Sequence, residues 1–325
     1  MRIFSGIQPT GSKHLGNYIG AIRQYVATQS EGDAYFCIVD LHSITVDYDP
    51  ADLRESTLSL GALLIAAGLD PDRCTLFVQS HVHEHAEGAW LLGAVTSFGE
   101  LRRMTQFKDK SEQQEFVSAG LFTYPVLQCA DILLYDTDVV PIGEDQRQHV
   151  ELARDVAERF NARFGETLVV PRAVFPEVGA RIMDLQQPEK KMSTTGGTPQ
   201  GTVLVLDEPD TIRRKFKSAV TDSGRDVLRA PDKPGITNLI DIMAVATGAE
   251  PGAIESRYDG QGYGPFKEDV GQAVVELLEP IRGRYRALRS DEAELRRLLG
   301  IGADKAQEVS ARTLGRMYER MGFAR

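Results

Sequence analysis

The alternation of short apolar runs with longer stretches of helical periodicity constrains the fold of this chain more than any other feature. The runs AYFCIVDL (34–41) and CTLFVQS (74–80) are too short for typical helices, and they are typical of parallel strands buried on both faces. RIFSGIQ (2–8) is predicted as a third strand, and LRESTLSLGALLIAAGL (53–69) as a helix between strands. This order predicts an α/β fold with a doubly wound parallel sheet, whose ligands bind at the carboxyl ends of the strands.

Helical spacing continues beyond these strands. Leu15, Ile19, Ile22 and Val26 share one face of a predicted helix. Further along, the pattern predicts helices at 119–136 and 144–164, a strand at 137–143, and a strand followed by a basic helix within 201–224. Because 325 residues suit about two domains, we place a boundary near residue 205, with one domain over 1–205 and a smaller all-helical domain over 206–325.

Composition limits the class of protein. A hydrophobic fraction of 42%, with no apolar run long enough to span a bilayer and no signal-peptide pattern, predicts a cytoplasmic protein with no membrane partner. The net charge of -10 argues against nonspecific coating of nucleic acid, although a local basic patch can still dock one RNA. Cys37, Cys74 and Cys129 are isolated, so we expect reduced core residues.

Two strand-to-helix turns carry residues suited to a nucleotide. GIQPTGSKHLGN (6–17) ends in His14, Gly16 and Asn17, where free backbone N–H groups favour an anion. PIGEDQRQH (141–149) repeats the arrangement with carboxylates and an amide that suit ribose hydroxyls or an ammonium group. Taken alone, each turn has an ordinary alternative, since strand-to-helix turns need glycine and acidic residues cap helices. The polar residues that follow the strands are Gln8, Asp40, His42, Gln79 and His81.

KKMSTTGGTP (190–199) combines lysines and hydroxyls with glycines and a proline that prevent regular structure. It is either a surface linker or a mobile loop that holds an anion. HLGN (14–17) and KMSTT (191–195) resemble the two signatures of class I aminoacyl-tRNA synthetases. Longer segments, among them ELRRMTQFKDK, YPVLQCADILLYDTDVVPIGEDQRQHVELARD and GARIM, resemble the tryptophanyl-tRNA synthetases over nearly the whole chain. The resemblance favours the mobile loop.

The resemblance implies that tryptophan is activated by ATP with Mg2+ as tryptophanyl-adenylate and is then transferred to tRNA(Trp). It implies a Rossmann-like catalytic domain with a helical dimer-interface insertion near 85–135, an anticodon-binding domain over 206–325, and a homodimer. The implied catalytic residues are His14, Asn17, Lys110, Lys191, Ser193 and Thr194. ATP is expected at Gln8, Pro9, Thr10, Gly16, Asn17, Gly143, Glu144, Asp145, Ile182, Lys191, Met192, Ser193, Thr194 and Thr195, and tryptophan at Phe4, His42, Tyr124, Gln128, Asp131 and Gln146. No protein-bound metal is implied.

The chain departs from the family pattern at three positions. Thr194 and Thr195 replace the second lysine and the last serine of the loop signature, so we expect slower activation unless Lys190 or Lys110 supplies the charge. Gln128 stands where the family usually has methionine, which leads us to expect altered tolerance for tryptophan-like inhibitors.

Two further features are better explained by ordinary structural roles than by function. HVHEHAE (81–87) lacks the spacing of HExxH, so we expect no zinc at His81, His83 and His85. The basic run IRRKFK (212–217) is most often a solvated helix face, and it is also a candidate for contact with the tRNA backbone.

Three other functions remain compatible with parts of the sequence. A tyrosyl enzyme shares the fold, and a noncatalytic synthetase-like binder would explain the altered loop. An adenylyltransferase acting on a small metabolite shares the first turn but does not need the long helical C-terminal part.

Overall fold

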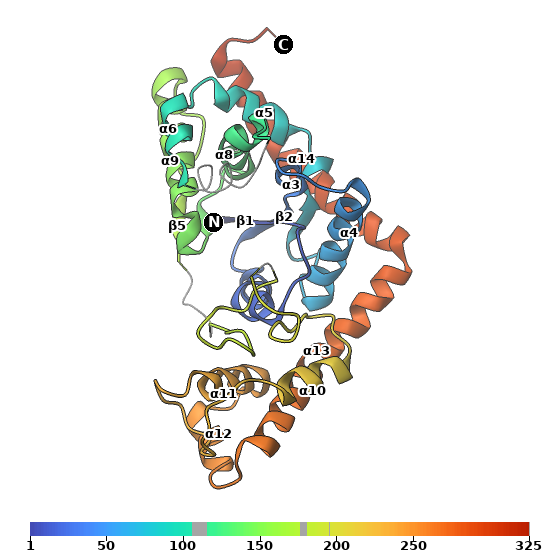
Figure 1. Ribbon diagram of the computed structural model, residues 1–325. Coiled ribbons are helices and arrows are strands. Elements are labelled where there is room, and N and C mark those ends of the chain that lie inside the picture. Colours follow the sequence, from blue (N-terminus) through green and yellow to red (C-terminus); the bar gives the residue numbers. More distant parts are fainter. Residues whose placement is uncertain (106–115, 176–180, 195, 325) are drawn as a thin grey trace.

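The computed structural model describes residues 1–105, 116–175, 181–194 and 196–324, and it is built around a five-stranded parallel sheet (Figure 1). The strand order is β3-β2-β1-β4-β5, so the order reverses between β1 and β4. Ligands of doubly wound sheets bind beside such a reversal, at the carboxyl ends of the strands. The predicted α/β fold is therefore confirmed. The strands are β1 (Arg2–Ile7), β2 (Asp33–Ile38), β3 (Thr75–Val78), β4 (Val139–Pro141) and β5 (Arg172–Val174).

Helices cover both faces of the sheet, and local sequence explains where they begin and end. Helix α4 (Pro50–Ala67) starts where the Asp49 carboxylate accepts hydrogen bonds from Ala51 N and Asp52 N, and it ends at Gly68, whose φ is 119°. The α-helices described are α1 (Leu15–Asn17), α2 (Arg23–Thr28), α3 (Asp40–Ser43), α4 (Pro50–Ala67), α5 (Glu84–Gly93), α6 (Phe98–Arg103), α8 (Ala119–Leu133), α9 (Arg147–Phe164), α10 (Pro209–Lys217), α11 (Pro234–Thr247), α12 (Pro251–Arg257), α13 (Tyr263–Ser290) and α14 (Glu292–Met321); a π-helix (Tyr18–Ile22) joins α1 to α2, and short 3-10 helices lie at Gln79–His81 and Glu144–Gln146.

The central strands are buried on both faces, as their apolar sequences predicted. Along β2, Phe36 and Ile38 enter a core shared with α4 and α13, while Tyr35 and Cys37 enter a second core formed with α5, α8, α9 and α14. Successive side chains of a strand point to opposite faces, so one apolar run fills two cores.

The expected strand within 201–206 is wrong. Leu204 makes only an isolated bridge with His14, supported by backbone hydrogen bonds from Leu15 N to Val203 O (2.8 Å) and from Val205 N to Lys13 O (2.9 Å). Val203 and Val205 are buried in the same core as Leu15 of the first turn. Strand β5, in contrast, was not anticipated from the sequence.

The C-terminal helices leave the sheet and then return to it. Helices α10 to α12 gather at one end of the molecule, α13 runs back from them, and α14 lies against β3 (Figure 1). A Cβ atom added to Gly302 of α14 would stand 1.8 Å from the carbonyl oxygen of Leu76, so the helix backbone touches the strand backbone. The boundary at residue 205 stays a prediction. No helix in the described part of the chain is long and apolar enough to cross a membrane.

Candidate active site

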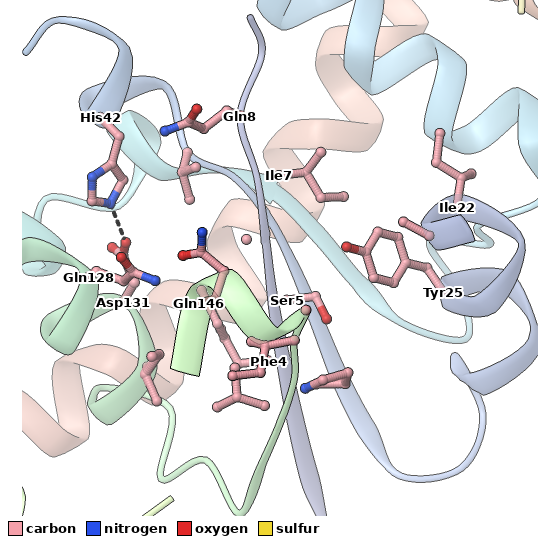
Figure 2. Close-up of a pocket in the computed structure, with 18 of the residues that line it drawn as sticks. Phe4, Ser5, Ile7, Gln8, Ile22, Tyr25, His42, Gln128, Asp131 and Gln146 are labelled. Carbon is pink, nitrogen blue, oxygen red and sulfur yellow. Dashed lines mark hydrogen bonds and ion pairs between the residues drawn. The ribbon is translucent and has the colours of Figure 1, made fainter. Parts of the chain in front are cut away.

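A cleft of about 410 Å³ opens at the carboxyl ends of β1 and β4, where the strand order reverses. Side chains from β1, from α3, from α8 and from the turn after β4 face it (Figure 2). The structure brings together in its lining nine residues that were predicted for the ligands: Phe4, Gln8, Asn17, His42, Tyr124, Gln128, Asp131, Gly143 and Gln146.

Asp131 is the buried charge of this cleft, with only 1% of its surface exposed. Its Oδ2 is 2.7 Å from His42 Nε2, and its Oδ1 accepts a hydrogen bond from Gln79 Nε2 (2.6 Å) and lies 2.6 Å from His85 Nδ1. Burial alone would raise the pKa of this carboxyl group, but the hydrogen bonds with His42 and His85 outweigh burial and hold the pKa well below its usual range. Asp131 is therefore a preorganised anionic acceptor.

His85 was considered in the sequence only as a doubtful metal ligand, and it has a different place. Its ring is fully buried between Asp131 and Tyr135, whose hydroxyl lies 2.7 Å from His85 Nε2. His83 is instead exposed beside Glu84. Within the described residues no three ligating side chains are grouped so that they could hold a metal ion. The sequence signal for this place is helical spacing: His85 lies near the start of α5, on the buried face that packs against α8.

Aromatic rings form the walls around the acceptor. The rings of Phe4 and Tyr135 stack with centroids 5.6 Å apart. The Tyr124 ring stands edge-on to His42, at 6.1 Å between centroids, and its hydroxyl is 3.1 Å from His149 Nε2. Burial raises the pKa of Tyr124 to about 12, so the phenol stays protonated. A flat, largely apolar ligand with one hydrogen-bond donor suits these walls.

The first turn is closed by a reciprocal cap. His14 Nδ1 accepts a hydrogen bond from Asn17 N (3.3 Å), and His14 N donates to Asn17 Oδ1 (3.1 Å). Burial, with added repulsion from Lys191 and Lys13, lowers the pKa of His14 to about 4. At neutral pH the ring is therefore uncharged, and because Nδ1 accepts, Nε2 carries the proton and can donate it to a ligand. A side chain at Gly16 would crowd the His14 ring at 3.1 Å and Ile182 at 3.6 Å.

The signature loop is tied to this turn. Met192 is buried, and its N–H donates to Ile182 O (3.1 Å), while Lys191 pairs with Met183 in an isolated bridge. The hydroxyl of Thr194 lies 3.5 Å from the point where a Cβ on Gly11 would stand. Ser193 O accepts a hydrogen bond from the Thr202 hydroxyl (2.8 Å). Lys110 and Thr195 lie outside the described residues.

Other predicted residues do not line the cleft. Glu144 is exposed and forms an ion pair with Arg147 (2.7 Å), and Asp145 accepts a hydrogen bond from Gln146 (2.7 Å). Pro9 lines a smaller cavity of about 290 Å³ on the other side of the first turn. The carbonyl oxygen of Thr10 accepts a hydrogen bond from Lys13 Nζ (2.9 Å).

Comparison with known proteins agrees with this geometry. Residues 1–279 match the family model described as tRNA synthetases class I (W and Y). The chain is 54% identical to a protein of Streptomyces avermitilis named Tryptophan--tRNA ligase 2, over 99% of this chain and 97% of that protein. It is 52% identical to Tryptophan--tRNA ligase of Caldanaerobacter subterraneus, over 99% and 98% of the two chains. A solved structure of tryptophanyl-tRNA synthetase from Campylobacter jejuni, complexed with ADP and tryptophan, matches with a TM-score of 0.89 and 34% identity, over 99% of this chain and 100% of that one.

Proposed function

We propose, from the premise that this chain belongs to the class I tRNA synthetases of the W and Y type, that its cleft transfers the AMP part of ATP to L-tryptophan with release of pyrophosphate and then passes the tryptophanyl group to tRNA(Trp). The chain is an enzyme of this family, and tryptophan-tRNA ligase activity follows from its full-length similarity to proteins of that name. The steps and residue roles that follow are our proposal.

The buried carboxylate of Asp131 is the observation that most supports selectivity for tryptophan. It is an ionised acceptor at the base of an aromatic-walled cleft, fixed by His42 and Gln79. An indole N–H pairs with it, whereas an amino acid without that donor leaves a buried charge unpaired. Phe4, Tyr124 and Gln128 surround the ring, and Gln146 faces the ammonium group.

The reaction needs no nucleophile from the protein. A carboxylate oxygen of tryptophan attacks the α-phosphorus of ATP, the bond to the bridging oxygen breaks, and pyrophosphate leaves with that electron pair. A ribose hydroxyl of tRNA then attacks the acyl carbon, loses its proton and expels AMP. Catalysis consists of positioning and of stabilising charge on the phosphates.

The first turn binds the phosphates and the adenine, and the turn after β4 binds the ribose. His14 Nε2 and Asn17 donate to the phosphates together with Lys191, Ser193 and Thr194. Gly16 and Ile182 form the adenine surface, since the missing side chain at Gly16 leaves room for a flat ring. The ribose is bound by Gly143, Glu144 and Asp145, with Gln8, Pro9, Thr10, Met192, Thr195 and Lys110 completing the ATP set.

Mg2+ enters as part of the substrate, Mg-ATP. The described residues offer no cluster of carboxylates or histidines that could hold a metal ion, and Mg2+ commonly binds through nucleotide phosphates. Its charge then adds to that of the lysines on the phosphates.

The enzyme acts as a cytoplasmic homodimer, with helices of the 206–325 region binding the anticodon. Supporting the dimer, Trp90 and Phe98 expose 83% and 69% of their surfaces within the 85–135 segment, next to an apolar groove of about 740 Å³ between α5 and α8. We expect Trp90→Glu to convert dimer to monomer in analytical ultracentrifugation. A wild-type monomer would contradict the dimer.

Exchange of labelled pyrophosphate into ATP tests the proposed function directly. The assay is run with Mg2+ and with tryptophan, tyrosine or no amino acid. We expect exchange with tryptophan alone. Exchange with tyrosine would indicate a tyrosyl enzyme, and no exchange by folded protein would indicate a noncatalytic binder.

A further inference from the structure

The signature loop lacks one positive charge, and the structure shows where that charge would have been. Thr194 is exposed at the tip of the loop, and its hydroxyl is 3.5 Å from the Cβ position of Gly11 in the first turn. A lysine at 194 would therefore extend over this turn and its ligand. A cation in the turn itself would reach the same space.

Lys13 is a cation of the first turn. It is half-buried and lines both the main cleft and the smaller cavity behind the turn. Its Nζ donates hydrogen bonds to Gln8 O and Thr10 O, each at 2.9 Å. An ammonium group has three N–H donors, so one donor is left after these two bonds within the described residues.

The charge of Lys13 already acts on the predicted phosphate site. His14 is the neutral donor proposed for that site, and repulsion from Lys191 and Lys13 adds to burial in lowering the pKa of its ring. One cation of the loop and one of the turn thus both act electrostatically on one neutral donor. Burial lowers the pKa of Lys13, whereas its two carbonyl acceptors favour the charged ammonium form.

We propose that Lys13 is a catalytic cation, which contacts the triphosphate of ATP and supplies the charge that Thr194 lacks. This inference rests on the proposed function, because it assigns a residue to the same nucleotide site. It differs from the alternative that Lys13 only braces the turn through the carbonyls of Gln8 and Thr10. The two roles predict different responses when a lysine is added to the loop.

The test is a double-mutant cycle of Lys13→Met and Thr194→Lys, measured by tryptophan-dependent pyrophosphate exchange and by calorimetric titration of Mg-ATP. A charge-assisted hydrogen bond is worth about 1.5 to 3 kcal/mol, or about 10- to 100-fold. We expect Lys13→Met to lower kcat/KM for ATP by about that factor and Thr194→Lys alone to change it by less than about threefold. In the double variant the loop lysine should restore most of the lost kcat/KM. A structural role of Lys13 in holding the turn would not produce this recovery.

Matched variants separate charge from structure. Lys13→Gln keeps a donor for the carbonyls but removes the charge, so we expect a loss as large as in Lys13→Met. Lys305→Met is the control, because Lys305 Nζ also donates to a backbone carbonyl, that of Pro71 (2.9 Å), but on α14. Lys190→Met tests the competing loop lysine. Binding of tryptophan alone, measured by equilibrium dialysis, should be the same in all variants.

Different results overturn the inference and the proposed function. If the wild-type enzyme shows no exchange, the proposed function fails, and Mg-ATP affinity in the same variants still decides the role of Lys13. If exchange occurs and Lys13→Met retains wild-type kcat/KM and ATP affinity, the inference is wrong. The inference is also wrong if Thr194→Lys does not raise the kcat/KM of Lys13→Met, or if Lys190→Met rather than Lys13→Met lowers kcat/KM.

Discussion

Replacement of Asp131 by asparagine tests whether one buried charge selects the indole ring. The carboxylate is 1% exposed, and its two oxygens have three partners: Gln79 and His85 on Oδ1, and His42 on Oδ2. Each carboxylate oxygen accepts about two hydrogen bonds, so Oδ2 keeps one position for a ligand donor. An analogue with sulfur in place of the indole N–H, 3-benzothienylalanine, leaves that position unpaired.

The magnitude follows from the charge on the acceptor. A hydrogen bond to a charged group contributes about 1.5 to 3 kcal/mol, and one to a neutral amide about 0.5 to 1.5 kcal/mol. We therefore expect the wild-type enzyme to prefer tryptophan over the analogue by about 10- to 150-fold in kcat/KM, and Asp131→Asn by only about 2- to 10-fold. Because the amide must also face His42 or Gln79 with its NH2 group, urea unfolding should show a loss of about 1 to 3 kcal/mol.

The assay is pyrophosphate exchange with each amino acid, at saturating ATP. Asp40→Asn is the matched control, since Asp40 also follows a strand but bonds Ser80 N and Oγ at 3.0 and 2.5 Å. Its preference ratio should equal that of the wild type. An unchanged ratio in Asp131→Asn would refute the role of this carboxylate in reading the indole N–H.

Three further predictions concern other residues. Gln128→Met should shift the inhibition constants of tryptophan-like inhibitors several-fold, because it removes an amide from the cleft; equal constants would contradict this. Since the pKa of His14 is lowered to about 4, its contribution to stability is present above about pH 6.5 and is lost as the pH falls toward 4; an NMR titration with a pKa near 6.5 would sink the assignment. Gly302→Ala should destabilise the fold by about 2 kcal/mol or more in urea unfolding. Gly315→Ala, on the same helix with no atom within 4 Å of the added Cβ, should stabilise it slightly, and equal effects would contradict the close contact of α14 with β3.

Local patterns in the sequence predicted the elements that depend on local physics. The central strands and helices α4, α8 and α9 lie where apolar runs and helical spacing put them. The short strand β5 and the irregular segment 202–206 did not follow from sequence, because their conformations depend on partners far along the chain. Val203, for example, is held by the backbone of Leu15, and no property of its own neighbours distinguishes that contact from a sheet.

The candidate site divides in the same way. Motifs identified His14, Asp131 and Gln146, and the structure places them at or beside one cleft. His85 was missed because its functional partner, Asp131, lies 46 positions away on another helix, and three histidines in alternation suggested a metal instead. Lys13 stood beside a recognised motif, but only the fold shows that this residue lines the cleft.

The contact of α14 with β3 has a consequence for the chain during its synthesis. Strand β3 is at the edge of the sheet, and the helix that covers it, α14 (Glu292–Met321), lies more than 200 residues later in the chain. An uncovered edge strand is a template for pairing with other chains, and a nascent chain emerges from its N-terminus onward. The growing polypeptide therefore exposes an adhesive edge until the thirty residues of α14 have left the ribosome. Premature termination before α14 should yield aggregates rather than a smaller working enzyme.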